Sequence, residues 1–526
     1  MKVASRYTPL AAGASAARAD ELLGWLRDFA ERRLSSRLMD ERRSVQPQTL
    51  LELGNRGFMG VQVDEKFGGL ALRNRDIARV LDQAAAIDLS LGTFLLVCLF
   101  PGVRPIAAFG SPSLKDAVLA DLASGRKLAG YAQTEPGAGT HFNAMAAQAV
   151  AQPDGTWRLS GDKVWIGNAQ WSSVLTVVAH DVDANGRRRG LTAFAVHTDQ
   201  PGVVLGRELP SMGMRGVVQG EVSFRDVAVD REQVVGAPKR GLEVGVDSMS
   251  WSRFAIASTC VGTLRRSAQL LARFGARREI STGRLVDHPV TRIALGLASV
   301  RTAACEALLE WITDALDAGR EVDAELFAVA KVTGSEFAWD STDRLMQGLG
   351  SRGYDEANGV PLLLRDARVT RIFEGASEPL FAFVGAAALV PSSDLYRALR
   401  DELRAPAVAD ALAEAVTRMR ARKLAGDEPL ARDWQCALAG QAACWAVLAA
   451  ALAARPARGL RERALAWARA ELDAACANAA AGVREEAFLP APAELDDALA
   501  EVLAPIGDVE QQLPAERWEL DPLLKR

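Results

Sequence analysis

The sequence predicts a mainly helical α+β protein in which one β unit lies between two helical parts. Apolar residues recur at helical spacing from about residue 18 to 125 and again from about 241 to 390. From about 130 to 235, residues alternate or form short runs rich in Val, Thr and Phe, separated by turn signals such as Asn185-Gly186. The length of 526 residues allows three or four structural units.

The expected elements follow from these patterns in chain order. In the first part, we expect helices over Ala19–Phe29, Thr49–Gly57, Asn74–Ile87 and Leu91–Phe100, the last ending at Pro101-Gly102. In the β unit, we expect antiparallel strands over Trp157–Lys163, Val174–His180, Leu191–His197 and Gly220–Val229. Three later helices are long enough for a helix bundle: Phe254–Phe274, Val290–Ala318 and Val322–Leu349.

A further helical region is expected after the bundle. Pro391–Asp394 has the composition of a linker, and Ala- and Arg-rich helical sequence continues from there to about Glu486. We therefore expect four domains, over residues 1–128, 129–237, 238–392 and 393–526. The apolar run Ala437–Ala454 is mostly Ala and contains Gln441, so it is interpreted as a packed helix and not as a membrane span.

Composition argues against several classes of function. The net charge of −4, with no long run of one sign, argues against nucleic acid as a main partner. The six cysteines are scattered without a CxxC pair, which is typical of buried free thiols in a reducing compartment. No two histidines have metal-ligand spacing, so no metal site is expected. The N-terminus lacks the apolar stretch of a secretory signal, and we expect a cytoplasmic protein.

Two motifs in the β unit carry candidate ligand-binding residues. Tyr131–Thr140 reads YAQTEPGAGT, and its glycines allow a backbone to approach a flat or phosphorylated ligand closely. Gln133 and Thr134 offer hydrogen bonds beside it, although a simple turn between domains has the same composition. In Leu159–Asn168, Trp165 stands between a strand and a Gly-Asn turn, where it could pack in a core or cover one face of an aromatic cofactor.

The last motif region contains a candidate base. Gly348–Gly353 spells GxGxxG, but a helical pattern and not a strand precedes it, so a dinucleotide-binding unit is not expected. Further on, Glu374 lies between the apolar pair Ile372-Phe373 and the small residues that follow. A carboxylate in apolar surroundings is either a satisfied structural acid or a base with a raised pKa.

Together, the order and spacing of these motifs resemble the acyl-CoA dehydrogenase family, over roughly residues 20 to 390. The resemblance implies an N-terminal helical domain, a middle antiparallel and barrel-like β domain, and a C-terminal four-helix bundle. Residues 393–526 would then form an additional helical domain. It also implies FAD as cofactor and a homodimer or homotetramer as the assembly.

The resemblance also assigns roles to residues of this chain. It implies Glu374 as the catalytic base, and Thr140, Arg253 and Gly375 as substrate-binding residues. The residues that it implies for FAD are Tyr131, Gln133, Thr134, Gly139, Thr140, Trp165, Gly167, Arg278, Gln347, Gly350, Ser351, Ala376 and Glu378. Among these, Gln347, Gly350 and Ser351 match a segment that reaches the FAD of a neighbouring subunit.

The implied reaction is the α,β-dehydrogenation of an acyl thioester. Glu374 would take the α-proton while N5 of FAD accepts the β-hydride, which leaves a trans-2-enoyl thioester. The implied substrate is an acyl-CoA or an acyl-carrier-protein thioester from fatty acid metabolism. The implied electron acceptor is an electron-transfer flavoprotein or oxygen.

Several positions depart from the family pattern. Gly167 and Ala376 replace hydroxyl residues that are common there, and Ser250 replaces an acid three residues before Arg253. The Arg-x-x-Phe-Gly motif that grips FAD across a dimer is degraded, and Arg277 or Arg278 would have to serve. These changes leave the substrate and its carrier open, including a carrier-protein thioester in a biosynthetic pathway.

Two other functions compete with dehydrogenation. A flavin monooxygenase or oxidase of the same fold would react with oxygen, but the retention of Glu374 favours desaturation. A non-catalytic, nucleic-acid-binding member is disfavoured by the net charge of −4. For the C-terminal extension, subunit packing is the first hypothesis, and binding to a membrane surface through Arg455–Arg463 is the second.

Overall fold

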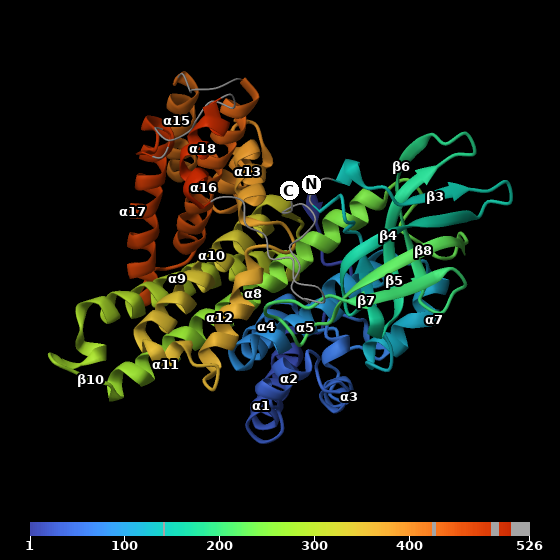
Figure 1. The fold of residues 1–526 in the computed structure, drawn as a ribbon, viewed down its shortest axis with the longest axis horizontal. Helices are drawn as coiled ribbons and strands as arrows, with labels where there is room; N and C mark the ends of the chain where they lie inside the picture. The colour runs from blue at the N-terminus through green and yellow to red at the C-terminus, as the bar shows by residue number, and fades with distance from the viewer. Residues whose placement is uncertain (140–141, 423–427, 485, 487–493, 507–526) are drawn as a thin grey trace.

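The protein consists of a helical base, a β unit at one side and a tower of C-terminal helices at the other (Figure 1). The computed structural model describes residues 1–139, 142–422, 428–484, 486 and 494–506. The alternation of helices, β unit and helices agrees with the order that the hydrophobic periodicity predicts. The last group of helices occupies the side of the bundle opposite the β unit (Figure 1).

The N-terminal part is helical, as expected. Its helices are α1 (Ala12–Arg32), α2 (Ser36–Arg42), α3 (Pro47–Asn55), α4 (Asn74–Ile87), α5 (Leu89–Val97), α6 (Arg104–Phe109) and α7 (Pro112–Ala123). A short strand, β1 (Lys2–Val3), precedes them and pairs with β12 (Val322–Asp323) of the bundle region. The first residues of the chain are thus fastened to a segment more than 300 positions away.

The apolar helix at Leu91 does not end at Pro101-Gly102, and this prediction is wrong. After α5 the chain continues as a π-helical segment, η3 (Cys98–Val103), and passes directly into α6. The wider π turn accommodates the ring and the missing N–H of Pro101 within a continuous helix. A Cβ on Gly102 would lie 2.5 Å from the carbonyl oxygen of Ala129, so this glycine permits close packing on the sheet.

The β unit is a mixed sheet of eight strands among the described residues. Its order is β7-β8-β4-β3-β5-β6-β9, with β2 added beside β5. The strands are β2 (Leu128–Ala132), β3 (Gln148–Ala151), β4 (Trp157–Gly167), β5 (Ser172–Val182), β6 (Arg188–His197), β7 (Val203–Glu208), β8 (Gln219–Val229) and β9 (Val234–Val235). Most pairs are antiparallel, as expected, but β5 pairs in parallel with both β2 and β3, which the periodicity did not reveal.

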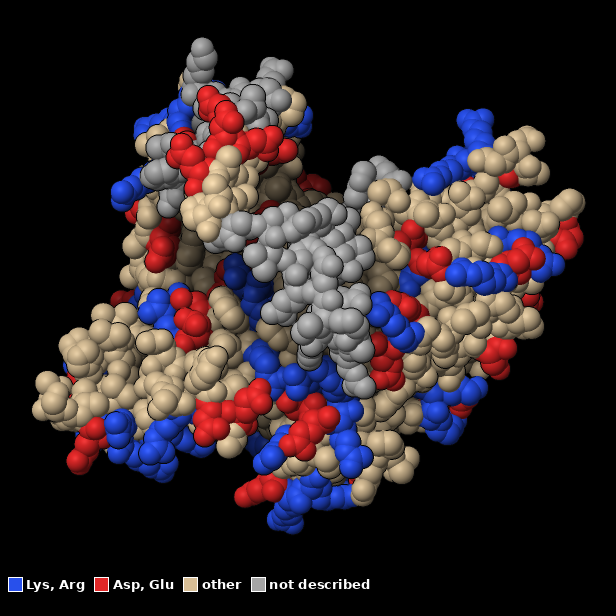
Figure 2. All heavy atoms as spheres, viewed as in Figure 1, with Lys and Arg blue, Asp and Glu red and all other residues tan. Residues whose placement is uncertain are grey.

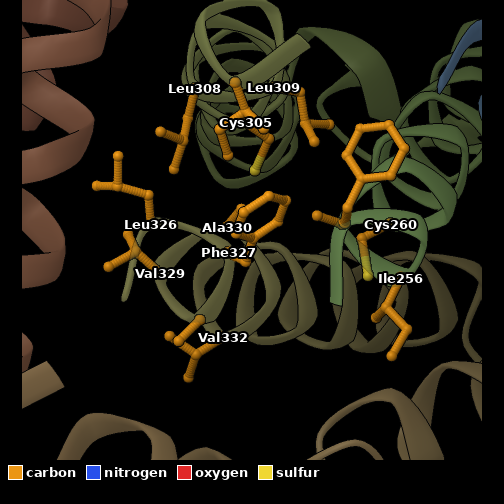
Figure 3. Packing of buried hydrophobic residues seen from close by; sticks show 14 of the residues in the cluster. Ile256, Cys260, Cys305, Leu308, Leu309, Leu326, Phe327, Val329, Ala330 and Val332 are labelled. Atoms are coloured by element: carbon orange, nitrogen blue, oxygen red, sulfur yellow. The ribbon is translucent and has the colours of Figure 1, made fainter. Parts of the chain in front are cut away.

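The bundle is built around two long, closely packed helices. These are α8 (Gly241–Arg277) and α10 (Ala324–Leu349), with α9 (Pro289–Asp317), α12 (Gly359–Thr370) and α13 (Ser377–Ala388) around them. A short α11 (Ser351–Tyr354) and a hairpin of β10 (Glu279–Ile280) and β11 (Gly283–Arg284) lie at one end. Between α8, α9 and α10 the core is aliphatic and aromatic, with Phe327 pointing toward Cys305 and Cys260 (Figure 3). All six cysteines are free, and only Cys476 is not fully buried.

The C-terminal extension is helical and packs on α13, α9 and α10. Its main helices are α14 (Asp394–Arg397), α15 (Pro406–Ala421), α16 (Glu428–Ala453), α17 (Leu460–Ala481) and α18 (Leu495–Leu503). An aromatic cluster joins it to the bundle: the rings of Phe337, Trp445 and Trp467 lie 5.0–5.6 Å apart, centroid to centroid. The extension and the bundle therefore share one hydrophobic core.

Two segments are long and apolar enough to cross a membrane by composition alone. They are Leu89–Phe109 and Pro429–Ala453, and their most apolar windows are 89% and 78% buried inside the protein. Burial of this extent is typical of core helices. It agrees with the interpretation of the Ala-rich run in α16 as a packed helix.

Helices α13 and α16 cross at two glycines. A Cβ on Gly385 would lie 1.7 Å from the carbonyl oxygen of Cys436, and a Cβ on Gly440 would lie 1.9 Å from that of Phe381. Because real Cβ atoms do not approach a carbonyl so closely, any side chain at either position would push the helices apart. The two glycines thus set the distance between the extension and the bundle.

We expect Gly440→Ala to lower the midpoint of thermal unfolding, because the two helices must separate to admit the methyl group. Overpacking of this kind costs about 1–3 kcal/mol or more. The matched control is Gly296→Ala on α9, where no atom lies within 4 Å of the added Cβ. There, the higher helix propensity of Ala should leave the midpoint unchanged or raise it. Equal midpoints for the two variants in calorimetry would contradict the proposed crossing.

Candidate active site

The candidate base, Glu374, lies in a tight turn between α12 and α13. We call residues 371–376 the glutamate turn. Glu374 has φ +54° and Gly375 has φ +96°, so two consecutive residues adopt the left-handed conformation. For a glutamate this conformation is strained, and it persists only where the surroundings impose it. The turn is bounded by hydrogen bonds from Phe373 N to Val369 O and from Ser377 N to Arg371 O.

Two cationic side chains hold the carbonyl groups of this turn. Arg253 on α8 donates from Nε to the Glu374 oxygen at 3.1 Å. Lys331 on α10 donates from Nζ to the Gly375 oxygen at 2.6 Å. Charge-assisted hydrogen bonds of this kind are stronger than neutral ones. The two central bundle helices therefore impose the left-handed turn from both sides.

The Glu374 carboxyl group is half-buried, and its pKa is raised from 4.5 to about 7. Burial is the main cause, and the charges of Arg253 and Lys331 oppose it. A carboxyl group of this pKa changes its charge near neutral pH, as a general base for reactions at neutral pH should. Burial raises the pKa of Tyr131 on β2, and the Glu374 carboxylate adds to this effect, so the carboxylate lies near the sheet.

Two predicted residues lie at the end of β2, near the turn that carries Glu374. Tyr131 donates from its hydroxyl to Gln133 Oε1 at 2.8 Å, and both side chains are buried. A Cβ on Gly245 of α8 would lie 3.5 Å from each of these two polar atoms. Tyr131 and Gln133 therefore line the α8 side of the sheet, and the structure brings them together with Arg253, Glu374 and Gly375.

Trp165 is the exposed aromatic side chain of this region. It lies in β4 with φ +58°, where the pairing register with β8 shifts between Lys163 and Ile166. Such a bulge turns one side chain out of the sheet, and 54% of Trp165 is exposed. Its neighbour Val164 donates from N to Thr134 O, which places the tryptophan beside the Tyr131–Thr140 motif. Trp165 is therefore not a core residue.

A buried ion pair stabilises the backbone of the Tyr131–Thr140 motif on the interior side of the sheet. Lys163 Nζ lies 2.8 Å from Glu135 Oε1, and both side chains are almost fully buried. The lysine also donates to the carbonyl oxygens of Gln133 and Val178, and Glu135 accepts from the backbone of Ala146 and Ala147. This network fixes the backbone of Gln133–Glu135, whose residues carry the candidate ligand contacts.

The residues around Trp165 fit a flat aromatic cofactor with a phosphate tail. Trp165 offers an exposed ring, and Gly137 and Gly139 have no atom within 4 Å of where a Cβ would be. Their backbone is thus open to close approach by a ligand. Gly167 packs its backbone against Val97 at the end of the same strand. Thr140 lies outside the described residues.

The remaining predicted cofactor residues lie elsewhere. Arg278, Gln347, Gly350 and Ser351 are exposed at the ends of α8 and α10, near β10 and α11 and far from the sheet (Figure 1). Within one chain they do not join the Glu374 site. Ala376 precedes the first turn of α13, and Glu378 lies exposed in that turn. These two stay beside the glutamate turn because they follow it in the chain.

Sequence reasoning missed Lys331 and gave no role to the pair of Lys163 and Glu135. The available signal for Lys331 was a single charged residue in the apolar stretch Phe327–Val332 of a bundle helix. Such a charge on a buried helix face needs a specific partner. The partner is a carbonyl oxygen 44 positions away, which no local pattern reveals.

Fold and site define a three-part protein in which a half-buried glutamate lies near a β unit whose exposed tryptophan suits an aromatic cofactor. The chain belongs to the acyl-CoA dehydrogenase family, whose members are FAD-dependent oxidoreductases acting on CH–CH bonds. Three family models match in order: the N-terminal domain over residues 17–126, the middle domain over 130–227 and the C-terminal domain over 239–389.

Relatives and solved structures agree with this assignment. The very long-chain specific acyl-CoA dehydrogenase of Rattus norvegicus is 30% identical over 369 residues, which cover 69% of this chain and 56% of that protein. The chain thus spans about half the length of such curated relatives. Butyryl-CoA dehydrogenase from Megasphaera elsdenii superimposes with a TM-score of 0.67 at 25% identity, covering 71% of this chain and 98% of that one.

One solved structure also covers the C-terminal extension. An acyl-CoA dehydrogenase complexed with FAD from Bacillus anthracis has a TM-score of 0.72 at 20% identity and covers 97% of this chain and 94% of that one. The additional helices therefore occur in another protein of this fold. The prolyl acyl carrier protein oxidase AnaB shares the fold as well, with a TM-score of 0.66 at 22% identity over 72% of this chain and 99% of that one.

We expect Lys163→Met to lower the free energy of unfolding by about 3–5 kcal/mol, because it leaves the buried Glu135 without its cation. Denaturant titration followed by tryptophan fluorescence measures this loss. The matched control is Arg225→Met on β8, which removes an exposed ion pair with Asp162, the residue before Lys163 in β4. That change should cost at most about 1 kcal/mol. Similar losses in both variants would contradict a special role for the buried pair.

Proposed function

We propose that the protein catalyses the FAD-dependent α,β-dehydrogenation of an acyl thioester, with Glu374 as the base. The observation that carries this proposal is the glutamate turn. A carboxyl group with a pKa of about 7 is held in a left-handed turn by two bundle helices and faces the sheet that carries Tyr131 and Trp165. A merely structural acid would not require a strained backbone or a raised pKa.

In the proposed reaction, Glu374 removes the α-proton of the thioester. The α-proton becomes more acidic when hydrogen bonds stabilise the developing enolate oxygen. The backbone N–H of Glu374 would be one such donor, because it makes no backbone hydrogen bond to another described residue. Arg253 and Lys331 hold the two carbonyl groups that follow this N–H, and so keep it aimed in one direction.

The proposed FAD site has two parts. Tyr131, Gln133, Thr134, Gly139, Trp165 and Gly167 would hold the ring and the adjoining chain, with Ala376 and Glu378 near the glutamate turn. FAD, when bound, supplies the acceptor for the hydride that leaves the β-carbon. The exposed group of Arg278, Gln347, Gly350 and Ser351 would serve the FAD of a neighbouring subunit, which implies a homodimer or homotetramer.

Acyl-CoA is the proposed substrate, and an electron-transfer flavoprotein is the proposed acceptor. A carrier-protein thioester is the second candidate. Ser250, buried on α8 where the family commonly has an acid, is one of the departures that leave the carrier open. Basic and acidic side chains are interspersed over the helical and β parts on the face in Figure 2, which gives no support to nucleic-acid binding.

We expect Glu374→Gln to keep its FAD but to lose substrate-dependent bleaching of the flavin absorbance. The amide preserves the shape of the side chain but cannot accept the α-proton. Anaerobic mixing with a panel of acyl-CoA and acyl-carrier-protein thioesters measures the effect, and the panel also identifies the carrier. Glu356→Gln, which changes an exposed glutamate near α12, is the control and should bleach as the wild type does. Full bleaching by Glu374→Gln would refute the assigned base.

We also expect the rate of flavin reduction to rise with pH through about 7. The pKa of Glu374 is raised to about 7, and only the deprotonated form accepts a proton, so the active fraction grows as pH rises through that value. Stopped-flow reduction between pH 5.5 and 9 provides the profile. A rate that is flat across this range, or that falls with pH below 7, would contradict a base of this pKa.

A further inference from the structure

Lys331 is a buried cation without a directly bonded acid. Its side chain is fully buried on α10, and among the described residues no carboxylate oxygen lies within the 4.0 Å that defines an ion pair. Its hydrogen-bond partner is the carbonyl oxygen of Gly375, at 2.6 Å. Burying an ammonium group without compensation is costly, and a neutral donor would satisfy a carbonyl equally well. The charge therefore needs a separate explanation.

A neutral donor does hold the neighbouring part of the same loop. Ser335, one helical turn after Lys331, donates to the carbonyl oxygen of Thr370 at 2.9 Å. Glu336 accepts from Arg371 Nε at 2.6 Å and from the hydroxyl of Ser377 at 2.5 Å. Side chains on one face of α10 thus bond to the loop at Thr370, at Gly375 and at Ser377. Of these three contacts, the one to Gly375 uses a buried cation.

Lys331 bonds the carbonyl group of the residue next to Glu374, so its charge lies close to that side chain. Lys331 and Arg253 are the two cations that lower the pKa of Glu374 against the effect of burial. Burial lowers the pKa of Lys331 to about 8, while Cys260, the Glu374 carboxylate and Glu336 act in the opposite direction. Each buried charge thus reduces the free-energy cost of the other, although they are not directly bonded.

The groups that act electrostatically on Glu374 are Arg253 on α8 and Lys331 on α10. Further titratable groups act on its neighbours: Asp247 on Tyr131, Cys260 and Glu336 on Lys331, and Glu325 on Arg253. Asp247 is already engaged by Arg104 in a bidentate pair at 2.7 and 3.0 Å. Glu336 is engaged by Arg371. Two cations thus act on Glu374: Arg253 from α8 and Lys331 from α10.

We propose that Lys331 is a positioning residue that acts through Glu374: its amine holds the Gly375 carbonyl group, and its buried positive charge beside the turn stabilises the ionised Glu374 side chain. This inference rests on the proposed function for its catalytic meaning. The effect on the carboxyl group itself can be measured without any substrate. Lys331 does not touch the thioester or FAD in this proposal, so it is not a catalytic residue.

The test compares the titration of the Glu374 carboxyl group in four forms of the FAD-loaded protein. They are the wild type, Lys331→Met, Lys331→Gln and Ser335→Ala, each labelled with ¹³C-carboxyl glutamate and observed by NMR. The Glu374→Gln variant assigns the signal by its disappearance. Met removes both the charge and the donor, whereas Gln keeps a donor without the charge. Ser335→Ala loosens the same loop without changing any charge.

We expect the Glu374 carboxyl group to titrate about one pH unit higher in both Lys331 variants, since loss of a nearby cation disfavours the anion. In Ser335→Ala it should titrate as in the wild type. Unchanged titration in Lys331→Gln, or an equal rise in Ser335→Ala, would overturn the proposal. If Lys331→Met does not fold, Lys331→Gln still decides the question, and Lys331→Arg should keep the wild-type value because it keeps the charge.

The rate of flavin reduction gives a separate measurement. With a reactive thioester, the rising limb of the pH profile should move up by the same one unit in Lys331→Gln and should not move in Ser335→Ala. If no thioester reduces the wild-type flavin, the proposed function fails, while the carboxyl titration still decides the role of Lys331. If the wild type is reduced and the pH profile of Lys331→Gln coincides with that of the wild type, the proposal on Lys331 fails and the proposed function stands.

Discussion

The structure of the site depends on the contact between two bundle helices and the carbonyl groups of one strained turn. Glu374 and Gly375 adopt left-handed backbone conformations, and Arg253 from α8 and Lys331 from α10 bond to their oxygens. These bonds form only if α8 and α10 keep a fixed distance and rotation. The aliphatic and aromatic core between them, with Phe327 at its centre, supplies that rigidity because close-packed interiors resist sliding (Figure 3).

Buried charges occur at the other junctions as well. Lys163 and Glu135 fix the start of the β unit, where the candidate cofactor motif lies. Arg104 pairs with Asp247 between α6 and α8, stacks over Trp251 at 4.1 Å and donates to the carbonyl oxygens of Ala4 and Ser5. Such pairs add little stability compared with apolar packing, but a buried charge without its partner is costly, so each pair permits only one arrangement of the parts.

The extension is joined to the site through α13. This helix begins two residues after Gly375, and it crosses α16 at Gly385 and Gly440 with carbonyl groups in near contact. The rings of Phe337, Trp445 and Trp467 tie α10, which carries Lys331, to α16 and α17. The extension thus packs on α13, which follows the glutamate turn, and on α10, which carries Lys331, and this gives it a structural role within a single chain.

The sequence by itself determined the order of the elements and the residues near Glu374 in the chain. Periodicity is a local property, so it located α4 to the residue, the long bundle helices and four of the eight strands of the main sheet. The motifs identified Tyr131, Gln133, Trp165 and Glu374 as candidates. A local signal also misled: Pro101 looked like a helix end, but a π turn accommodates it. Only the tertiary structure decided the parallel pairing of β5, the exposed position of Trp165 and the contact of Lys331 with Gly375. These features join residues far apart in the chain, and their free energies depend on burial and on distances that exist only once the helices and the sheet have packed together.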